Sequence, residues 1–159
     1  MSETTEETRH LERAIELAAG VDPDSGDLPF GAVVALDGHV LGESANHVGT
    51  LVDPTAHAEI LALRRAARTL GRPRLSGAVL YSSAEPCPMC LAACLWARID
   101  RVVHAAHVAD STEYGFDDED FYRQLRLPAR DRSLPAEPAD PPWRDAAVAV
   151  FESWSRGTR

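Results

Sequence analysis

His57, Cys87 and Cys90 carry side chains that could together hold a metal ion. Imidazole nitrogen and thiolate sulfur both bind zinc, and a catalytic zinc site uses three protein ligands with a fourth position left for water. Zinc lowers the pKa of that water toward about 7. Glu59 lies two residues after His57, so it can reach the same water without being a ligand. The pattern predicts a hydrolytic zinc site in which Glu59 is the catalytic general acid and base.

The Cys-x-x-Cys pair alone is ambiguous, because it also fits a redox pair, two buried thiols or a structural metal site. A redox pair has no need of a His-x-Glu motif upstream. A closed structural site needs a fourth ligand, for which Cys94, one helical turn after Cys90, is the candidate. The alternative is that Cys94 packs as a small apolar residue. We favour a buried Cys94 and an open site with one zinc ion per subunit.

Both halves of the motif fall where the sequence predicts that a helix begins. Turn residues at 53–55 precede a helix at 56–70, and Pro88 stands in the first turn of a helix at 88–97, where proline is tolerated. A helix N-terminus carries unpaired N–H groups and partial positive charge, which stabilise a thiolate. We therefore expect two helix ends to converge on one ion.

Helices and strands alternate along the rest of the chain, which indicates a layered α/β domain with helices packed on a sheet. Asp37-Gly38 is a strong hairpin signal, so the first two strands pair antiparallel and the sheet is mixed. The expected helices are 7–19, 56–70, 88–97 and 143–154, and the expected strands are 30–36, 39–44, 78–82 and 101–105.

Length and composition are those of an ordinary globular protein, with 159 residues of which 45% are hydrophobic. The formal net charge of −9 argues against a general affinity for nucleic acid. Three cysteines do not make a disulfide framework, and residues 1–8 are too polar and acidic for a signal peptide. We expect a cytoplasmic protein with no membrane contact.

The chain is expected to have a catalytic domain at 1–127, followed at 128–159 by a proline-rich linker and a C-terminal helix. That helix either packs on its own chain or exchanges with a second subunit across the linker.

From about His10 to the last helix, the sequence resembles the cytidine deaminase superfamily and, within it, the guanine deaminase branch of bacteria. The zinc motifs are shared by many members, whereas Gly-Phe-Asp-Asp at 115–118, followed by an acidic helix, is more selective for the guanine branch. The resemblance implies a three-layer α/β/α sandwich with a mixed five-stranded sheet, and a homodimer that exchanges C-terminal segments. The resemblance rests on residues 28–34, 53–59, 85–90, 96–98 and 114–118.

The resemblance also implies substrate-binding residues. Asn46 would hydrogen-bond the substrate ring, Phe30 and Trp96 would shape the pocket beside Ala58, and Asp118 would contact the purine edge. From the residues alone, Asn46 is a good turn residue, the two aromatic residues fit a core, and Asp118 fits an acidic helix start.

One departure concerns the end of the chain, where guanine deaminases of this type commonly carry a tyrosine that enters the active site. The segment 151–159 has no tyrosine, which fits a wider pocket, a different base, a nucleoside or a triazine. Glu113 and Glu119 remain rivals to Asp118 as the acid that contacts the substrate.

The favoured hypothesis is hydrolysis of guanine to xanthine and ammonia. The alternatives are deamination of another ring (cytosine, cytidine, guanosine or an aminotriazine such as ammeline) and tRNA adenosine deamination, which would require a basic surface. The non-enzymatic alternative is a zinc-stabilised binding module, which would not need Glu59. The spacing of the remaining histidines suggests no second metal site; they are His10, His39, His47, His104 and His107.

Overall fold

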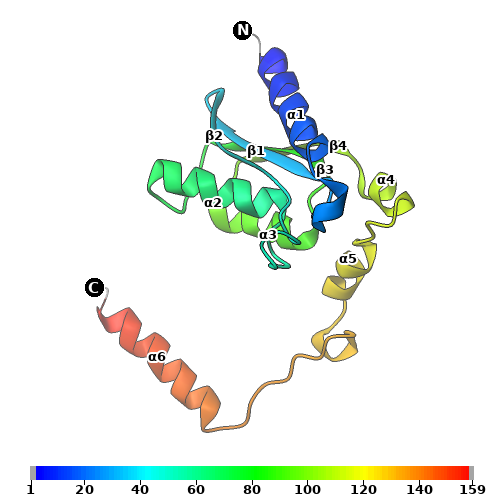
Figure 1. Cartoon of the computed structure of the whole chain (residues 1–159). Coiled ribbons are helices and arrows are strands. Elements are labelled where there is room, and N and C mark those ends of the chain that lie inside the picture. The colour runs from blue at the N-terminus through cyan, green and yellow to red at the C-terminus, as the bar shows by residue number, and fades with distance from the viewer. Residues whose placement is uncertain (1–2, 158–159) are drawn as a thin grey trace. The chain divides into compact units, whose positions relative to one another are not determined.

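The computed structural model describes residues 3–157, and the chain divides into two compact units, of which the first ends at Glu119 and the second begins at Asp120. The first unit contains a four-stranded sheet with helices on both of its faces (Figure 1). The expected three-layer α/β/α sandwich is confirmed. The boundary at 127/128 between a catalytic domain and a linker stays a prediction.

The sheet is mixed, as expected, and its strands lie in the order β2-β1-β3-β4. The hairpin partners β1 and β2 are antiparallel, β1 and β3 are antiparallel, and β3 and β4 are parallel. The parallel pair brings the C-terminal ends of two strands to the same edge of the sheet, where the loops that carry the site begin. The strands are β1 (Gly31–Leu36), β2 (His39–Ala45), β3 (Val79–Ala84) and β4 (Arg101–Ala106).

The turn between β1 and β2 has the chemistry that its sequence predicts. Asp37 and Gly38 both have positive φ, 49° and 76°. Two such residues in a two-residue loop match the twist of the flanking strands, which is why Asp-Gly favours this turn.

The expectation of a fifth strand is wrong for the residues that the structure describes. After β4 the chain enters the helix α4 (Val108–Glu113) and then the helix α5 (Glu119–Arg126). The Asp110 carboxylate accepts the backbone N–H of His107 at 2.8 Å, an N-terminal bond that favours a helix at this point. The continuous apolar run that follows β4, residues 146–151, lies in the helix α6 rather than in a strand.

The helix α1 (Glu3–Ala19) covers one face of the sheet, and α2 (Ala58–Leu70) and α3 (Pro88–Ala97) cover the other (Figure 1). Successive residues of β1 point to opposite faces, so Val33 packs toward α1 and Val34 toward α2. Both are fully buried, which explains why β1 reads as a continuous apolar run.

The helix α2 lies very close to β2 at Gly42. A Cβ atom there would lie 2.5 Å from the backbone oxygen of Ala62, so no larger residue fits without moving the helix. This close approach fixes the position of α2, which begins with the residues of the expected site.

The second unit contains most of α5, a short 3-10 turn at Ala129–Asp131, and the helix α6 (Trp143–Gly157). None of the residues of α6 is buried, and its large apolar side chains are exposed. Within residues 3–157, no helix combines the length and the apolar character needed to cross a membrane.

Candidate active site

Two helix N-termini supply the three expected metal ligands. His57 is the residue before α2, Cys87 is the residue before α3, and Cys90 lies in the first turn of α3. His57 and Cys87 have extended backbone angles, and Pro88 is the first helical residue of α3, as predicted. Both helices therefore begin at residues that face the same point.

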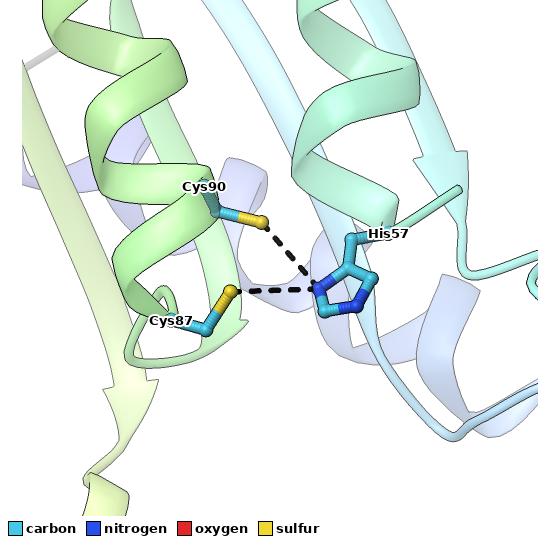
Figure 2. A group of neighbouring side chains, drawn as sticks. All are labelled: His57, Cys87 and Cys90. Atoms are coloured by element: carbon cyan, nitrogen blue, oxygen red, sulfur yellow. Dashed lines mark hydrogen bonds between the residues drawn. The ribbon is translucent and has the colours of Figure 1, made fainter. Parts of the chain in front are cut away.

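The geometry of these three side chains fits one zinc ion. The Sγ atoms of Cys87 and Cys90 lie 3.6 Å and 3.5 Å from Nδ1 of His57, and both point toward it (Figure 2). Tetrahedral zinc with Zn–N near 2.05 Å and Zn–S near 2.3 Å separates such atoms by about 3.6 Å. The donor set, two sulfurs and one imidazole, is also one that zinc prefers.

The thiols of this group do not ionise alike. The hydrogen bond from Cys90, aided by His57, lowers the pKa of Cys87 to about 4, despite burial. The bond to Cys87, burial and the Glu59 charge raise the pKa of Cys90, which retains the proton. The bond to Cys87 raises the pKa of His57. A metal that binds here must displace the protons that the group retains.

Cys94 lies outside the ligand group. It is buried in the apolar core between the sheet and the helices α2 and α3, with Leu75 and Leu80 in the same cluster. Burial raises the pKa of this thiol to about 12. The alternative in which Cys94 closes a structural site is thus not supported.

Glu59 lies in the first turn of α2 and is only 6% exposed. Its two oxygens accept hydrogen bonds from Ser82 Oγ at 3.3 Å and from Cys90 Sγ at 3.5 Å. Burial raises the pKa of this carboxyl, and the Cys87 charge adds to the effect. A buried carboxyl with a raised pKa, next to a metal site, is suited to accept and donate protons during a reaction.

The side chain of Asn46 is buried and has a defined orientation. Its Oδ1 atom accepts the backbone N–H groups of Leu28 and Val48, both at 3.1 Å. The amide N–H₂ group is therefore the part of the Asn46 side chain that can donate hydrogen bonds to a ligand. The backbone N–H of Asn46 donates to the carbonyl of Phe30, which joins these two expected pocket residues.

The other expected substrate residues differ in their surroundings. Phe30 is half-buried and packs edge-on against Phe116, with ring centres 5.2 Å apart. Ala58 is fully buried at the start of α2, whereas Trp96 on α3 is 84% exposed. The structure thus brings Phe30 into a packed wall and leaves Trp96 open to solvent.

Asp118 has a buried Oδ1 atom without a hydrogen-bond partner among the described residues. Burial raises its pKa, and so does the charge of Cys87. Asp118 in turn acts on the pKa of His57, so its carboxyl interacts with the ligand group. Its rivals Glu113 and Glu119 are exposed.

Two residues of this region were not assigned from the sequence. Ser82 could have been found from strand periodicity, because it shares the inner face of β3 with Leu80 and Ala84. Phe116 belongs to the Gly-Phe-Asp-Asp segment, but nothing in its spacing indicates a contact with Phe30.

The fold and the ligand geometry agree with comparisons with known proteins. The family described as the "cytidine and deoxycytidylate deaminase zinc-binding region" matches residues 4–106, and the chain belongs to this family. The deaminase resemblance and the α/β fold are thus confirmed.

Among its relatives is the guanine deaminase of Bacillus subtilis (strain 168), which is 48% identical over 126 residues, 79% of this chain and 80% of the relative. The X-ray structure of guanine deaminase from Bacillus subtilis superimposes with a TM-score of 0.87, covering 98% of this chain and 95% of the other at 41% identity. A tRNA-specific adenosine deaminase of Agrobacterium fabrum (strain C58) is 45% identical over 101 residues, 64% of this chain and 66% of the relative.

Proposed function

We propose that this protein is a zinc-dependent hydrolase that converts guanine and water to xanthine and ammonia. The observation that carries the chemistry is the trio of His57, Cys87 and Cys90 at zinc-binding distances beside the buried carboxyl of Glu59. The choice of guanine is supported by the similarity to the guanine deaminase of Bacillus subtilis over most of both chains.

His57, Cys87 and Cys90 would hold one zinc ion per subunit, and the bound ion would supply Lewis-acid chemistry that makes water a nucleophile near neutral pH. Glu59 accepts a proton from that water and delivers protons to a ring nitrogen and to the departing amine, so that ammonia leaves. Its raised pKa suits both directions of transfer. The hydrogen bond from Ser82 keeps one carboxyl oxygen in place.

Recognition of the base would rest on Asn46 and Asp118. Guanine presents O6 and N7 as acceptors, which match the free amide N–H₂ group of Asn46. Its ring N–H and amino groups are donors, which match the unpartnered carboxyl oxygen of Asp118. Phe30 would form the apolar wall. Ala58, in the first helical turn, would contact the base through a backbone N–H that has no partner within the helix.

Ammonia release by the zinc-loaded protein tests the substrate. The panel consists of guanine, guanosine, cytosine, cytidine, adenine and an aminotriazine such as ammeline. We expect guanine to have the highest kcat/KM. Turnover of another ring without turnover of guanine would reject the substrate and retain the chemistry.

Glu59→Gln separates an enzyme from a zinc-stabilised binding module. The amide keeps the shape of the side chain but cannot exchange the proton, so we expect kcat to fall about 10²- to 10⁴-fold with zinc still bound. Unchanged rates at equal zinc content would favour the binding module. Glu12→Gln is the matched control, because Glu12 is an exposed acid on α1, which covers the other face of the sheet.

Deamination of adenosine in tRNA is the second candidate, favoured by the similarity to tRNA-specific adenosine deaminases. The formal net charge of −9 opposes it, because a tRNA stem attracts a basic surface. Inosine formation in tRNA, with a strongly salt-dependent complex, would support this candidate over guanine.

We further propose a homodimer in which α6 packs on a second copy of the chain. No residue of α6 is buried, and Trp143, Phe151 and Trp154 are each at least 70% exposed although their side chains are large and apolar. Such apolar side chains in one helix need a covering surface. The linker at 128–142 is rich in proline and can extend by about 3.3 Å per residue, enough to reach a neighbour. The exposed Trp96 would be covered in the same assembly.

Light scattering after size-exclusion chromatography tests this assembly. We expect a dimer for the full chain and a shift toward monomer for Phe151→Ser together with Trp154→Ser. Arg144→Ser on the same helix should leave the mass unchanged. A monomeric wild-type chain would reject the dimer.

We also place the protein in the cytoplasm, since its three free thiols suit reducing surroundings.

A further inference from the structure

A second group of three possible metal ligands lies outside the thiolate site. Glu85 follows β3, His104 lies in β4, and His107 is the residue before α4. One donor atom of each lies within 4.8 Å of the others. No local motif joins Glu85 to the two histidines. The parallel pairing of β3 with β4, in which Ala84 is opposite Ala106, brings the two strand ends together.

One nitrogen of the His104 ring is held by the backbone. Its Nδ1 atom lies 2.9 Å from the carbonyl oxygen of Ala106. A carbonyl can only accept, so Nδ1 carries the hydrogen and Nε2 of the neutral ring has a free lone pair. Ligating histidines almost always donate their other N–H group to a carbonyl or a carboxylate. His104 thus already has the supporting bond that a ligand needs.

Glu85 is also fixed, because its Oε2 atom accepts the backbone N–H of Val108 at 3.2 Å. Nδ1 of His107 lies 4.0 Å from the same oxygen. The two imidazole rings meet edge to face, at 82° with centres 5.3 Å apart, so they do not stack. The group therefore has two anchored members and one nearby imidazole.

The spread of donor atoms can close around an ion. In tetrahedral zinc sites with nitrogen and oxygen ligands, two ligand atoms lie about 3.4 Å apart. The three donor atoms of this group lie within 4.8 Å of one another, so they must approach each other to bind an ion. The side chain of His107 is 74% exposed, so rotation of its ring meets little resistance. Rotation of this exposed ring can bring one of the three donors closer to the other two without a change in β3 or β4.

We propose that Glu85, His104 and His107 form a second site, which binds a divalent transition-metal ion through nitrogen and oxygen atoms alone. Imidazole suits zinc, copper and nickel, and a carboxylate completes a three-ligand site with room for water. An ion there would tie the loop that begins at Glu85 and carries Cys87 to the start of α4. The site is independent of which base the protein deaminates.

Titration of the metal-free full chain with Co²⁺ distinguishes the two sites. Cobalt bound by Cys87 and Cys90 gives intense sulfur-to-metal charge-transfer absorption, whereas cobalt bound by nitrogen and oxygen gives only weak ligand-field bands. We expect a first equivalent with the intense absorption and a second without it. Elemental analysis after gel filtration counts the ions that remain bound.

The variant His104→Gln/His107→Gln should lose the second equivalent and keep the charge-transfer absorption. The single variant His107→Gln, at an exposed position that does not threaten folding, should weaken the second equivalent at least about tenfold. His39→Gln is the control, since His39 is an exposed histidine outside the cluster. One equivalent in the wild-type chain, or a second equivalent that is unchanged by His107→Gln, would overturn the proposal.

Discussion

The chain has two groups of possible metal ligands, and only Pro86 separates Cys87 of one group from Glu85 of the other. The two groups are built differently. The thiolate group uses residues at two helix starts, and its donor atoms already stand 3.5 and 3.6 Å apart. The second group uses the ends of two strands and a loop residue, with donors spread over as much as 4.8 Å.

The difference concerns how much of each site exists before a metal arrives. In the thiolate group, helix starts and burial fix the side chains, and sulfur ligands bind zinc strongly. In the second group, His107 is exposed and must move. We therefore expect tight binding at the thiolate site and weaker, more readily reversed binding at Glu85, His104 and His107.

The largest contrast should come from removing one ligand from each group. Cys87→Ser should abolish zinc binding at the thiolate site and lower kcat at least about 10³-fold, because several kcal/mol of transition-state stabilisation depend on the metal. His107→Gln should leave turnover within about twofold while it weakens the second ion. Elemental analysis and steady-state ammonia release measure both.

Circular dichroism serves as the control for the folding of Cys87→Ser. If Cys87→Ser kept zinc and full activity, the ligand assignment would be wrong. A loss of activity in His107→Gln as large as that in Cys87→Ser would mean that the two groups act as one site.

The same contrast explains what could be predicted from the sequence. His57, Glu59, Cys87 and Cys90 lie in short motifs at helix starts, so local spacing was enough to expect their convergence. Glu85 has no local spacing to His104 and His107, because the pairing of β3 with β4 brings it to these histidines from far away in the chain. The histidine positions alone gave no sign of this cluster.

The sheet shows a similar limit. Each of the four observed strands was expected from its own apolar run and its turn signals, to within a few residues. The fifth strand came from the resemblance alone, and the apolar run at 146–151 lies in the helix α6. The orientation of the buried Asn46 side chain could not be predicted from the sequence either, because its two hydrogen bonds depend on how the loop around Leu28 folds.

A substitution at Asn46 should change substrate recognition without affecting either group of metal ligands. Asn46→Asp keeps an oxygen for the N–H groups of Leu28 and Val48 but removes the amide donor. We expect kcat/KM for guanine to fall about 10- to 100-fold with the zinc content unchanged. Isothermal titration with xanthine should show the matching loss of affinity.

Asn46→Ala tests the structural part of the same side chain. It leaves two partly buried backbone N–H groups without their partner, which should lower the free energy of unfolding by about 1–3 kcal/mol. If Asn46→Asp and Asn46→Ala were equally unstable and equally inactive, the donor role of Asn46 would lose its support.

A smaller effect is expected at Ser82, whose hydroxyl holds one oxygen of Glu59. Ser82→Ala should lower kcat about 2- to 10-fold, the worth of one hydrogen bond, and should leave zinc bound at the thiolate site. Ser82→Thr restores the hydroxyl and should recover most of the rate. A merely structural role would instead change the unfolding free energy and leave kcat unchanged.

The smallest effect should come from His10, a histidine that is buried without being a ligand. It is 2% exposed, its ring lies 4.9 Å from that of Tyr81, and its Nε2 atom has no hydrogen-bond partner among the described residues. Burial lowers its pKa below the ordinary 6.5, and the Arg9 charge adds to this effect, whereas Glu6 opposes it. Folding then favours the neutral ring.

Because the folded pKa of His10 is the lower one, its neutral form stabilises the fold above about pH 6.5, and that stability is lost as the pH falls through and below this value. His10→Phe keeps an aromatic ring against Tyr81 and removes the titration. Urea unfolding at pH 7.5 and pH 5.5 should therefore show a smaller loss of stability on acidification for His10→Phe than for the wild-type chain. Acid also releases zinc from both proteins, but this contribution cancels in the difference, since His10 belongs to neither metal group. Equal losses in the two proteins would show that burial of His10 has no effect on the pH dependence of folding.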